Sequence, residues 1–253
     1  MTVDGVIRRL LNATERLTYT RIFRRRFLPA GISLADDIRN HLSRTKIDIV
    51  FDVGANTGQS ALEYLSFFPG ARIFCFEPVT PTFAQLTANL KHYRDVQCFP
   101  LALGAMDGKR TIQVSSQSTL SSLLPLPEDM GTLYKGQLQE VDLKSVDNFC
   151  YEHHIENISF LKVDTEGYDL EVLKGAENML KNQAAAILQV EAGMSFRNAL
   201  HTPFEELKAH LEHRQYVLFG IYEQVREWTK NEPHLRRANL VFISEQVIAE
   251  NRK

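Results

Sequence analysis

Long hydrophobic runs are missing from this sequence of 253 residues. No run reaches about 18 consecutive apolar residues, so we expect no membrane-spanning helix. The N-terminus lacks an apolar segment followed by a small-residue cleavage site, which favours a cytoplasmic protein over a secreted one. The formal net charge of −2 gives no general attraction to nucleic acid.

Cysteine is also scarce. Cys75, Cys98 and Cys150 are an odd number of thiols, and none has metal-ligand spacing to another. Because Cys75 and Cys98 lie in apolar runs, we expect free, buried thiols in a reducing compartment. The cysteines therefore predict neither a disulfide framework nor a metal site.

Two common nucleotide-binding motifs are absent from the stretch around which the chain is organised. Residues 47–53 are mostly apolar and β-branched, and a loop bounded by Gly54 and Gly58 follows, with helical spacing after it. The loop reads D-V-G-A-N-T-G, which matches neither G-x-G-x-x-G nor G-x-x-x-x-G-K-[ST]. The pattern predicts a strand, a tight turn and a helix, with a ligand-binding loop that suits neither a dinucleotide nor a nucleoside triphosphate.

A second strand-like run narrows the choice of ligand. Residues 72–78 read R-I-F-C-F-E-P, and Glu77 lies 23 positions after Gly54, near the spacing of an acid that binds ribose hydroxyls. A glycine loop and a ribose acid without a pyrophosphate motif fit a nucleoside that carries no phosphates, such as S-adenosylmethionine. The alternative is an ordinary strand–turn–helix in which Glu77 is a solvated strand end.

Strands and helices alternate through most of the chain, which predicts an α/β fold with a parallel sheet covered on both faces. Thr80 is a candidate N-cap before Pro81, and Asp107-Gly108 predicts a hairpin between residues 101–103 and 111–114. The last two strands, without a clear helix between them, predict an antiparallel pair. The expected strands are 47–53, 72–77, 95–101, 141–143, 160–164, 185–191, 216–222 and 240–243, and the expected helices are 58–67, 80–92, 145–153, 170–181 and 203–213.

Residues 1–45 form a basic, helical prelude to the domain predicted for residues 46–253. Residues 1–30 contain seven arginines and two acids, interspersed with apolar residues. A basic amphipathic helix of this kind could make weak peripheral contact with an anionic membrane, or it could pack on the main domain or on a second copy in a homodimer. Ser33, with Asp36 three residues later, predicts the start of a short helix that reaches about Leu42.

Acidic residues follow four predicted strands. Asp52, Glu77, Asp164 and Glu191 all lie at carboxyl ends, which face one crevice in an open α/β sheet. Four carboxylates gathered there repel one another unless they bind a ligand or pair with bases. Asp164 and Glu166 are the candidates for orienting a hydroxyl, taking its proton or holding a cation; for Asp164 a helix cap, and for Glu191 a salt bridge under a loop, are the alternatives.

Four segments together resemble the FkbM-type S-adenosylmethionine-dependent methyltransferases. They read V-F-D-V-G-A-N-T-G-Q, F-E-P, A-L-G and L-K-V-D-T-E-G-Y-D-L-E-V-L-K-G-A, and they lie between residues 47 and 191. In the last segment Asp169 stands where the family often has Glu. The resemblance implies a class I methyltransferase (Rossmann-like) sheet, mostly parallel with an antiparallel C-terminal strand, and methyl transfer to an oxygen.

The resemblance also implies roles for individual residues. Asp52 would belong to the cofactor site, and the loop that follows it would hold the methionine part of S-adenosylmethionine. Glu77 would bind the ribose, with Pro78 shaping the turn, and Ala102 and Leu103 would flank the adenine. Asp164 would face the methionine amine and the acceptor, and Glu166 would form the acceptor side. The loop residues concerned are Gly54, Ala55, Asn56, Thr57 and Gly58.

The sequence thus predicts an O-methyltransferase that uses S-adenosylmethionine, with Asp164 and Glu166 as catalytic residues and no resident metal. The acceptor would be a small molecule or glycan with a hydroxyl, such as a sugar or a secondary metabolite. Methylation of a carboxylate or amine, a metal-assisted reaction with Asp164 and Glu166 as ligands, and an inactive cofactor-binding interaction protein remain alternatives.

Overall fold

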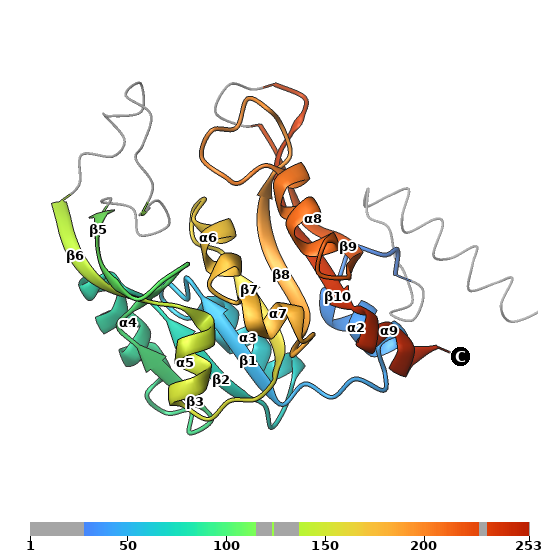
Figure 1. Cartoon of the computed structure of the whole chain (residues 1–253), viewed down its shortest axis with the longest axis horizontal. Helices are drawn as coiled ribbons and strands as arrows, with labels where there is room; N and C mark the ends of the chain where they lie inside the picture. Colours follow the sequence, from blue (N-terminus) through green and yellow to red (C-terminus); the bar gives the residue numbers. More distant parts are fainter. Residues whose placement is uncertain (1–27, 115–122, 124–136, 228–231, 253) are drawn as a thin grey trace, which may run out of the picture.

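A seven-stranded sheet forms the centre of the computed structural model, which describes residues 28–114, 123, 137–227 and 232–252 (Figure 1). Its strand order is β3-β2-β1-β7-β8-β10-β9. Five neighbouring strands are parallel, and β10 is antiparallel to both β8 and β9. These strands are β1 (Ile49–Val53), β2 (Arg72–Phe76), β3 (Val96–Phe99), β7 (Ile158–Val163), β8 (Ala185–Gly193), β9 (Tyr216–Arg226) and β10 (Leu235–Ser244). This topology is a class I methyltransferase fold, and the predicted antiparallel C-terminal pair is confirmed.

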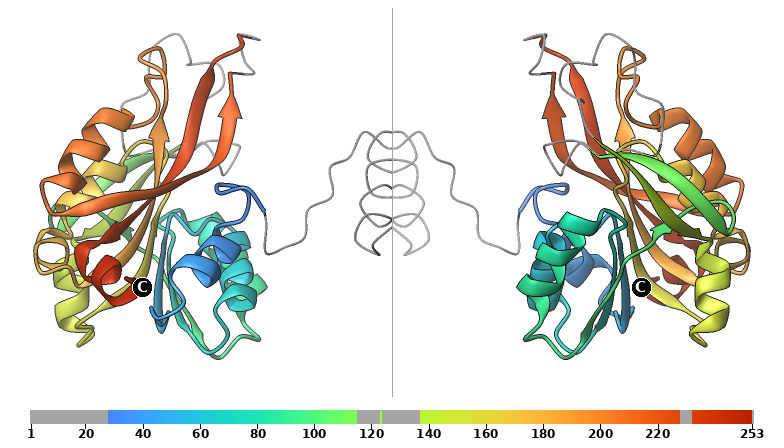
Figure 2. Two further views of the ribbon diagram at one scale, coloured as in Figure 1. Left: turned by 90° about the vertical axis from the view of Figure 1, so that its right-hand side faces the viewer. Right: turned by 90° about the vertical axis from the view of Figure 1, so that its left-hand side faces the viewer.

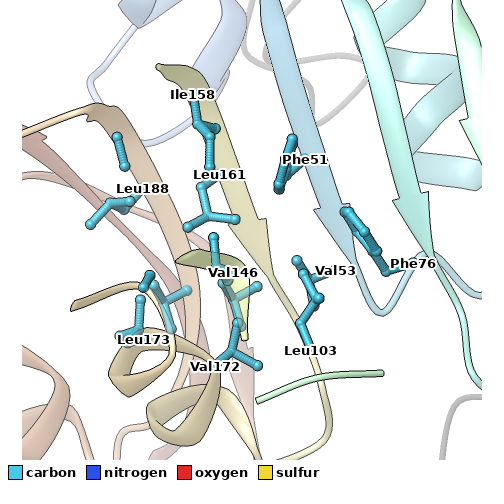
Figure 3. Packing of buried hydrophobic residues seen from close by; sticks show 14 of the residues in the cluster. Phe51, Val53, Phe76, Leu103, Val146, Ile158, Leu161, Val172, Leu173 and Leu188 are labelled. Carbon is cyan, nitrogen blue, oxygen red and sulfur yellow. The ribbon is translucent and has the colours of Figure 1, made fainter. Parts of the chain in front are cut away.

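Helices cover both faces of the sheet, as the continuous apolar strands predict. The helices are α2 (Leu34–His41), α3 (Gln59–Phe67), α4 (Thr80–Leu90), α5 (Val146–Glu152), α6 (Asp169–Lys174), α7 (Glu177–Lys181), α8 (Phe204–Glu212) and α9 (Glu245–Asn251). On one face Phe51 and Leu161 pack with Val146 of α5 and Leu173 of α6 (Figure 3). On the other face Phe160 packs with residues of α2, α3, α4 and α9. Helix α9 was not predicted from the sequence.

A smaller sheet of three strands accompanies the main one. It contains β4 (Ala102–Leu103), β5 (Gly108–Val114) and β6 (Gln137–Lys144) in the order β4-β6-β5, and the β5–β6 ribbon stands apart from the main sheet (Figure 2). The predicted hairpin between residues 101–103 and 111–114 is therefore wrong. Strand β6 lies between the two, parallel to β4 and antiparallel to β5, because pairing with a distant strand replaces the local turn.

The helix predicted for residues 170–181 is divided into α6 and α7. Asp147 of α5 accepts hydrogen bonds from the backbone N–H groups of Asn178 (2.7 Å) and Met179 (3.0 Å), and so starts a second helix. At the junction, a Cβ on Gly175 would lie 1.9 Å from the carbonyl oxygen of Gly104. The break therefore lets the backbone of α6–α7 approach the loop after β4.

The two predicted N-caps have different outcomes. Ser33 caps α2, and its hydroxyl accepts a hydrogen bond from the backbone N–H of Asp36. Thr80 is instead the first residue of α4, and Val79 occupies the cap position. The backbone N–H of Val79 donates to the Glu77 carboxylate (2.8 Å). Glu77, which precedes the helix, thus accepts the N–H of the residue at the cap position, and no side chain of that residue caps the helix.

The described part of the basic prelude packs on the sheet. Ile38 and Leu42 are buried in the core, and the Tyr222 hydroxyl donates a hydrogen bond to Asp37 (2.9 Å). The arginine-rich residues 1–27 lie outside the described residues, so the domain boundary at residue 45 and a membrane or homodimer contact stay predictions. Within the described ranges, no helix is both long and apolar enough to cross a membrane.

Candidate active site

A cavity of about 220 Å³ opens where the carboxyl ends of β1, β2, β7 and β8 meet. This is where an open α/β sheet binds its ligands. The cavity wall brings together residues that are far apart in the sequence, and most of the residues predicted to bind the cofactor are among them: Gly54, Ala55, Asn56, Glu77, Pro78, Ala102, Leu103 and Asp164. Glu166 lines the same cavity.

Gly54 lets the loop after β1 pack against the end of β7. Its φ of +77° lies in the left-handed region. A Cβ at this position would lie 1.9 Å from the carbonyl oxygen of Asp164. The backbone N–H groups of Gly54 and Ala55 both donate to the carbonyl of Phe76 at 3.0 Å. The absence of a side chain at Gly54 therefore allows the ends of β1 and β7 to lie close together, with Asp164 beside the loop.

Three residues predicted to contact the cofactor do not line the cavity. Asp52 is fully buried and pairs with Lys162. The carbonyl of Thr57 accepts a hydrogen bond from the Asn89 side chain, facing α4 (2.9 Å). A Cβ on Gly58 would meet Leu86 and Leu90 at 3.0 Å. A direct cofactor contact by Asp52, Thr57 or Gly58 therefore stays a prediction, and in the structure Gly58 allows close packing of α3 and α4.

Glu77 is a buried carboxylate at the cavity wall. Its Oε2 accepts the backbone N–H of Asn56 (3.1 Å), and its Oε1 accepts that of Val79 (2.8 Å). Burial raises the pKa of Glu77 to about 7, although these two hydrogen bonds oppose the shift. Next to it, Oδ1 of Asn56 is buried without a hydrogen-bond partner in the described structure. The wall therefore offers a fixed acceptor pair that a ligand with hydroxyl donors could use.

Lys162 is a member of the cavity wall that the sequence analysis missed. Its ammonium lies 3.1 Å from Oδ1 of Asp52 and 3.3 Å from Oδ2 of Asp164. Burial opposes its charge, but the two carboxylates raise the pKa of Lys162 well above its usual value. A lysine inside the buried run F-L-K-V-D was the available signal, because a charge in a central strand must be paired.

The turn after β7 presents Asp164 and Glu166. Asp169 is fully buried and accepts backbone N–H groups from Thr165 (3.4 Å) and Gly167 (3.1 Å). The shorter acid at position 169 therefore holds the turn. Burial, followed by the charges of Glu191 and Asp164, raises the pKa of Glu166 to about 8. Burial also raises the pKa of Asp164, although Lys162 opposes the shift.

Glu191 completes the acidic edge of the cavity from β8. Arg237 of β10 binds its Oε1, and Nε2 of His201 lies 2.9 Å from its Oε2. The same His201 nitrogen is 3.9 Å from Oε2 of Glu166. Basic groups thus pair with Glu191, as the salt-bridge alternative predicted, and the crevice holds Asp164, Glu166 and Glu191 side by side.

Comparison with known proteins places this geometry in a family. A model of the methyltransferase FkbM domain matches residues 52–218. The chain belongs to the FkbM methyltransferase family. The match runs from the end of β1 to the start of β9, and so includes the glycine loop, Glu77, Lys162 and Asp164. The class I sheet and the family predicted from the sequence are thereby confirmed.

Several curated relatives align with between 51% and 58% of this FkbM-family chain. The 2-O-methyltransferase NoeI of Sinorhizobium fredii is 24% identical over 52% of this chain and 58% of its own length. The hexuronic acid methyltransferase AglP of Haloferax volcanii is 30% identical over 58% of this chain and 57% of its own. The methyltransferase sdnD of Sordaria araneosa is 28% identical over 51% of this chain and 60% of its own length. Each match therefore spans less than two thirds of the relative.

Solved structures are more distant. Fibrillarin of Aeropyrum pernix, in complex with S-adenosyl-L-methionine, is 11% identical over 79% of this chain and 68% of its own, with a TM-score of 0.44. At this level the likeness adds nothing to the sheet topology described above.

Proposed function

We propose that this protein is an S-adenosylmethionine-dependent O-methyltransferase that methylates a hydroxyl group of a sugar. The observation that carries the proposal is the buried Glu77 carboxylate at the wall of a cavity in an FkbM-family fold. Two relatives, a 2-O-methyltransferase and a hexuronic acid methyltransferase, support a sugar acceptor.

The cavity fits the proposed cofactor. Glu77 presents a carboxylate for the two ribose hydroxyls, and Oδ1 of Asn56 is buried beside it without a partner in the described chain. Ala102 and Leu103 form the apolar wall where an adenine would lie. Gly54 and Asp164 would enclose the methionine part. When bound, S-adenosylmethionine supplies an electrophilic methyl group.

Asp164 is the residue proposed to take the acceptor proton. Its side chain is 32% exposed and lines the cavity, and Lys162 holds one of its oxygens at 3.3 Å. An ion pair on one side fixes the carboxylate, which leaves the other oxygen for the acceptor hydroxyl. A carboxylate base in this position would contribute on the order of 10²–10⁴-fold. Glu166 would orient the acceptor, and most of the rate would come from holding the two reactants together.

A calorimetric titration tests the cofactor assignment. S-adenosylhomocysteine, added to the purified protein, is expected to bind saturably with one molecule per chain. A folded protein that takes up none of it would overturn the proposal. Subsequent incubation with S-adenosylmethionine and a panel of sugars, uronic acids, amines and carboxylates, followed by mass spectrometry, would show which acceptor atom gains a methyl group.

The titration of Glu77 predicts how that binding depends on pH. With a pKa of about 7 in the free protein, Glu77 is ionised at pH 8 and mostly protonated at pH 6. Because hydroxyl donors favour the carboxylate form, S-adenosylhomocysteine should bind about tenfold more weakly at pH 6 than at pH 8. An affinity that is constant between these two pH values would contradict the role of Glu77.

The same pKa has a consequence for folding. The folded-state pKa of Glu77 is raised above its usual value, so the free folded protein binds a proton that the unfolded chain has already released. Its contribution to stability is therefore greatest below its ordinary pKa and falls as the pH rises through about 7. Bound ligand should oppose this loss, since it favours the ionised form.

A further inference from the structure

His201 provides a donor set that neither the sequence nor the family match assigned. Nε2 of His201 and one carboxylate oxygen each of Glu166 and Glu191 all lie within 4.8 Å of one another. The His201 and Glu191 side chains are only 5% and 3% exposed. One imidazole and two carboxylates are ligand types that divalent transition cations accept. The sequence analysis had considered Asp164 and Glu166 instead.

Asn198 determines which nitrogen of His201 carries the proton. Its Nδ2 donates to the carbonyl of Arg236 (2.9 Å), and its Oδ1 accepts the backbone N–H of Leu200 (3.1 Å), so the orientation of the amide is settled. That same Oδ1 lies 3.1 Å from Nδ1 of His201. Nδ1 must therefore donate to it. In a neutral imidazole the lone pair is then on Nε2, the nitrogen that faces the carboxylates.

A lone pair on Nε2 would repel the carboxylate oxygens that it faces, so either a proton on Nε2 or a metal cation must lie between them. Nε2 approaches Oε2 of Glu191 to 2.9 Å, and when the lone pair is on Nε2 this buried oxygen has no hydrogen-bond donor among the described residues. Ligand atoms bound about 2.0–2.2 Å from one cation lie roughly 3.0–3.5 Å apart. The His201–Glu191 separation is close to that range, and the wider 3.9 Å separation between His201 and Glu166 would close by rotation of the Glu166 carboxylate.

We propose that Glu166, Glu191 and His201 bind a divalent transition cation at the edge of the cavity, with Asn198 as the hydrogen-bonded support of the histidine. A histidine ligand that donates its other N–H to an oxygen is the usual arrangement at such centres. Arg237, on the opposite oxygen of Glu191, balances part of the negative charge and leaves Oε2 for the cation.

The position suggests what the cation does. Glu166 and Glu191 line the cavity, whereas His201 lies behind them. Open coordination positions would therefore face the cavity, where two neighbouring oxygens of an acceptor could bind and be oriented. This role rests on the proposed methyl transfer, but cation binding itself does not.

Binding of Mn²⁺ to protein without a histidine tag tests the site, followed by the loss of the free-ion signal in electron paramagnetic resonance. The wild-type chain should bind one Mn²⁺, His201→Ala should bind none, and Asn198→Ala should bind about 10–100-fold more weakly. His234→Ala is the matched control, because His234 also faces a carboxylate (Glu232, 3.3 Å) outside the cluster; it should leave the affinity unchanged.

Two results would overturn the proposal. One is a folded wild-type protein that binds neither Mn²⁺ nor, in equilibrium dialysis, Zn²⁺. The other is His201→Ala with wild-type affinity while its thermal unfolding is unchanged. In the first case His201 is a protonated ion-pair partner of Glu191. A parallel titration with S-adenosylhomocysteine separates the two proposals, because cofactor binding that persists without cation binding removes only the metal site.

Discussion

Replacing Lys162 with Met should lower the free energy of unfolding by about 3–5 kcal/mol, the usual effect of breaking a buried ion pair. Asp52 is fully buried, and Lys162 is its ion-pair partner in the described structure. Its second oxygen, Oδ2, already has no hydrogen-bond partner among the described residues. The substitution would therefore leave an uncompensated charge between two central strands. Urea denaturation of the two proteins measures the difference.

A matched surface variant and a double variant make this prediction specific. Lys109 pairs with Glu140 at 2.7 Å, but both side chains are 64% exposed. Lys109→Met should therefore cost less than about 1 kcal/mol. Replacing Asp52 by Leu together with Lys162→Met should recover most of the lost stability, since the fully buried partner of Lys162 is removed with it, whereas its other partner, Asp164, is 32% exposed and can be hydrated. If the Lys162 and Lys109 variants lost the same free energy of unfolding, Asp52 would not need Lys162 to remain stable in the core.

The second large effect is expected for Glu77→Gln, which should bind S-adenosylhomocysteine at least about 100-fold more weakly than the wild type. Hydrogen bonds to a charged group contribute about 1.5–3 kcal/mol each, and two ribose hydroxyls would donate to this carboxylate. The glutamine amide keeps the size of the side chain, but it offers only one oxygen, for which the N–H groups of Asn56 and Val79 compete. Calorimetry at pH 8 gives the ratio.

Thermal unfolding and a neutral control distinguish lost binding from lost structure. Glu156 is exposed, and Glu156→Gln removes the same charge without touching the cavity. It should bind like the wild type. If Glu77→Gln retained wild-type affinity while folded, Glu77 would not be the ribose acid, and the position of the cofactor in the cavity would have to change.

Local pattern accounts for most of the fold. Strands β1, β2, β7 and β8 are apolar runs of strand length, and each ends at or near an acid or a glycine loop. Hydrophobic periodicity and turn-forming residues were therefore sufficient to predict these strands. Contacts between segments far apart in the sequence could not be predicted in this way. The β5 partner is β6 rather than residues 101–103, and α7 begins where Asp147 of another helix supplies its cap.

Part of the candidate site could also be predicted from local sequence patterns. Gly54 could be selected from its loop, Glu77 from its distance to that loop along the chain, and Asp164 from its motif. All three residues line the cavity. His201 was not selected, since it lies beyond the motif, in a stretch after β8 that has no pattern of its own. Its relation to Glu166 and Glu191 exists only once the chain is folded.

The sequence by itself determined the class of the fold, the family and the acids at the strand ends, because hydrophobic period and short motifs are local properties. Tertiary structure alone decided which of these residues meet. Asp52 precedes the loop and Thr57 and Gly58 belong to it, yet Asp52 pairs with Lys162, and Thr57 and Gly58 pack against α4. Burial then sets the charge of Glu77, and the register of β8 with β10 brings Arg237 to Glu191. Solvent exclusion and strand pairing depend on the whole folded chain, so they cannot be predicted from a short segment of the sequence.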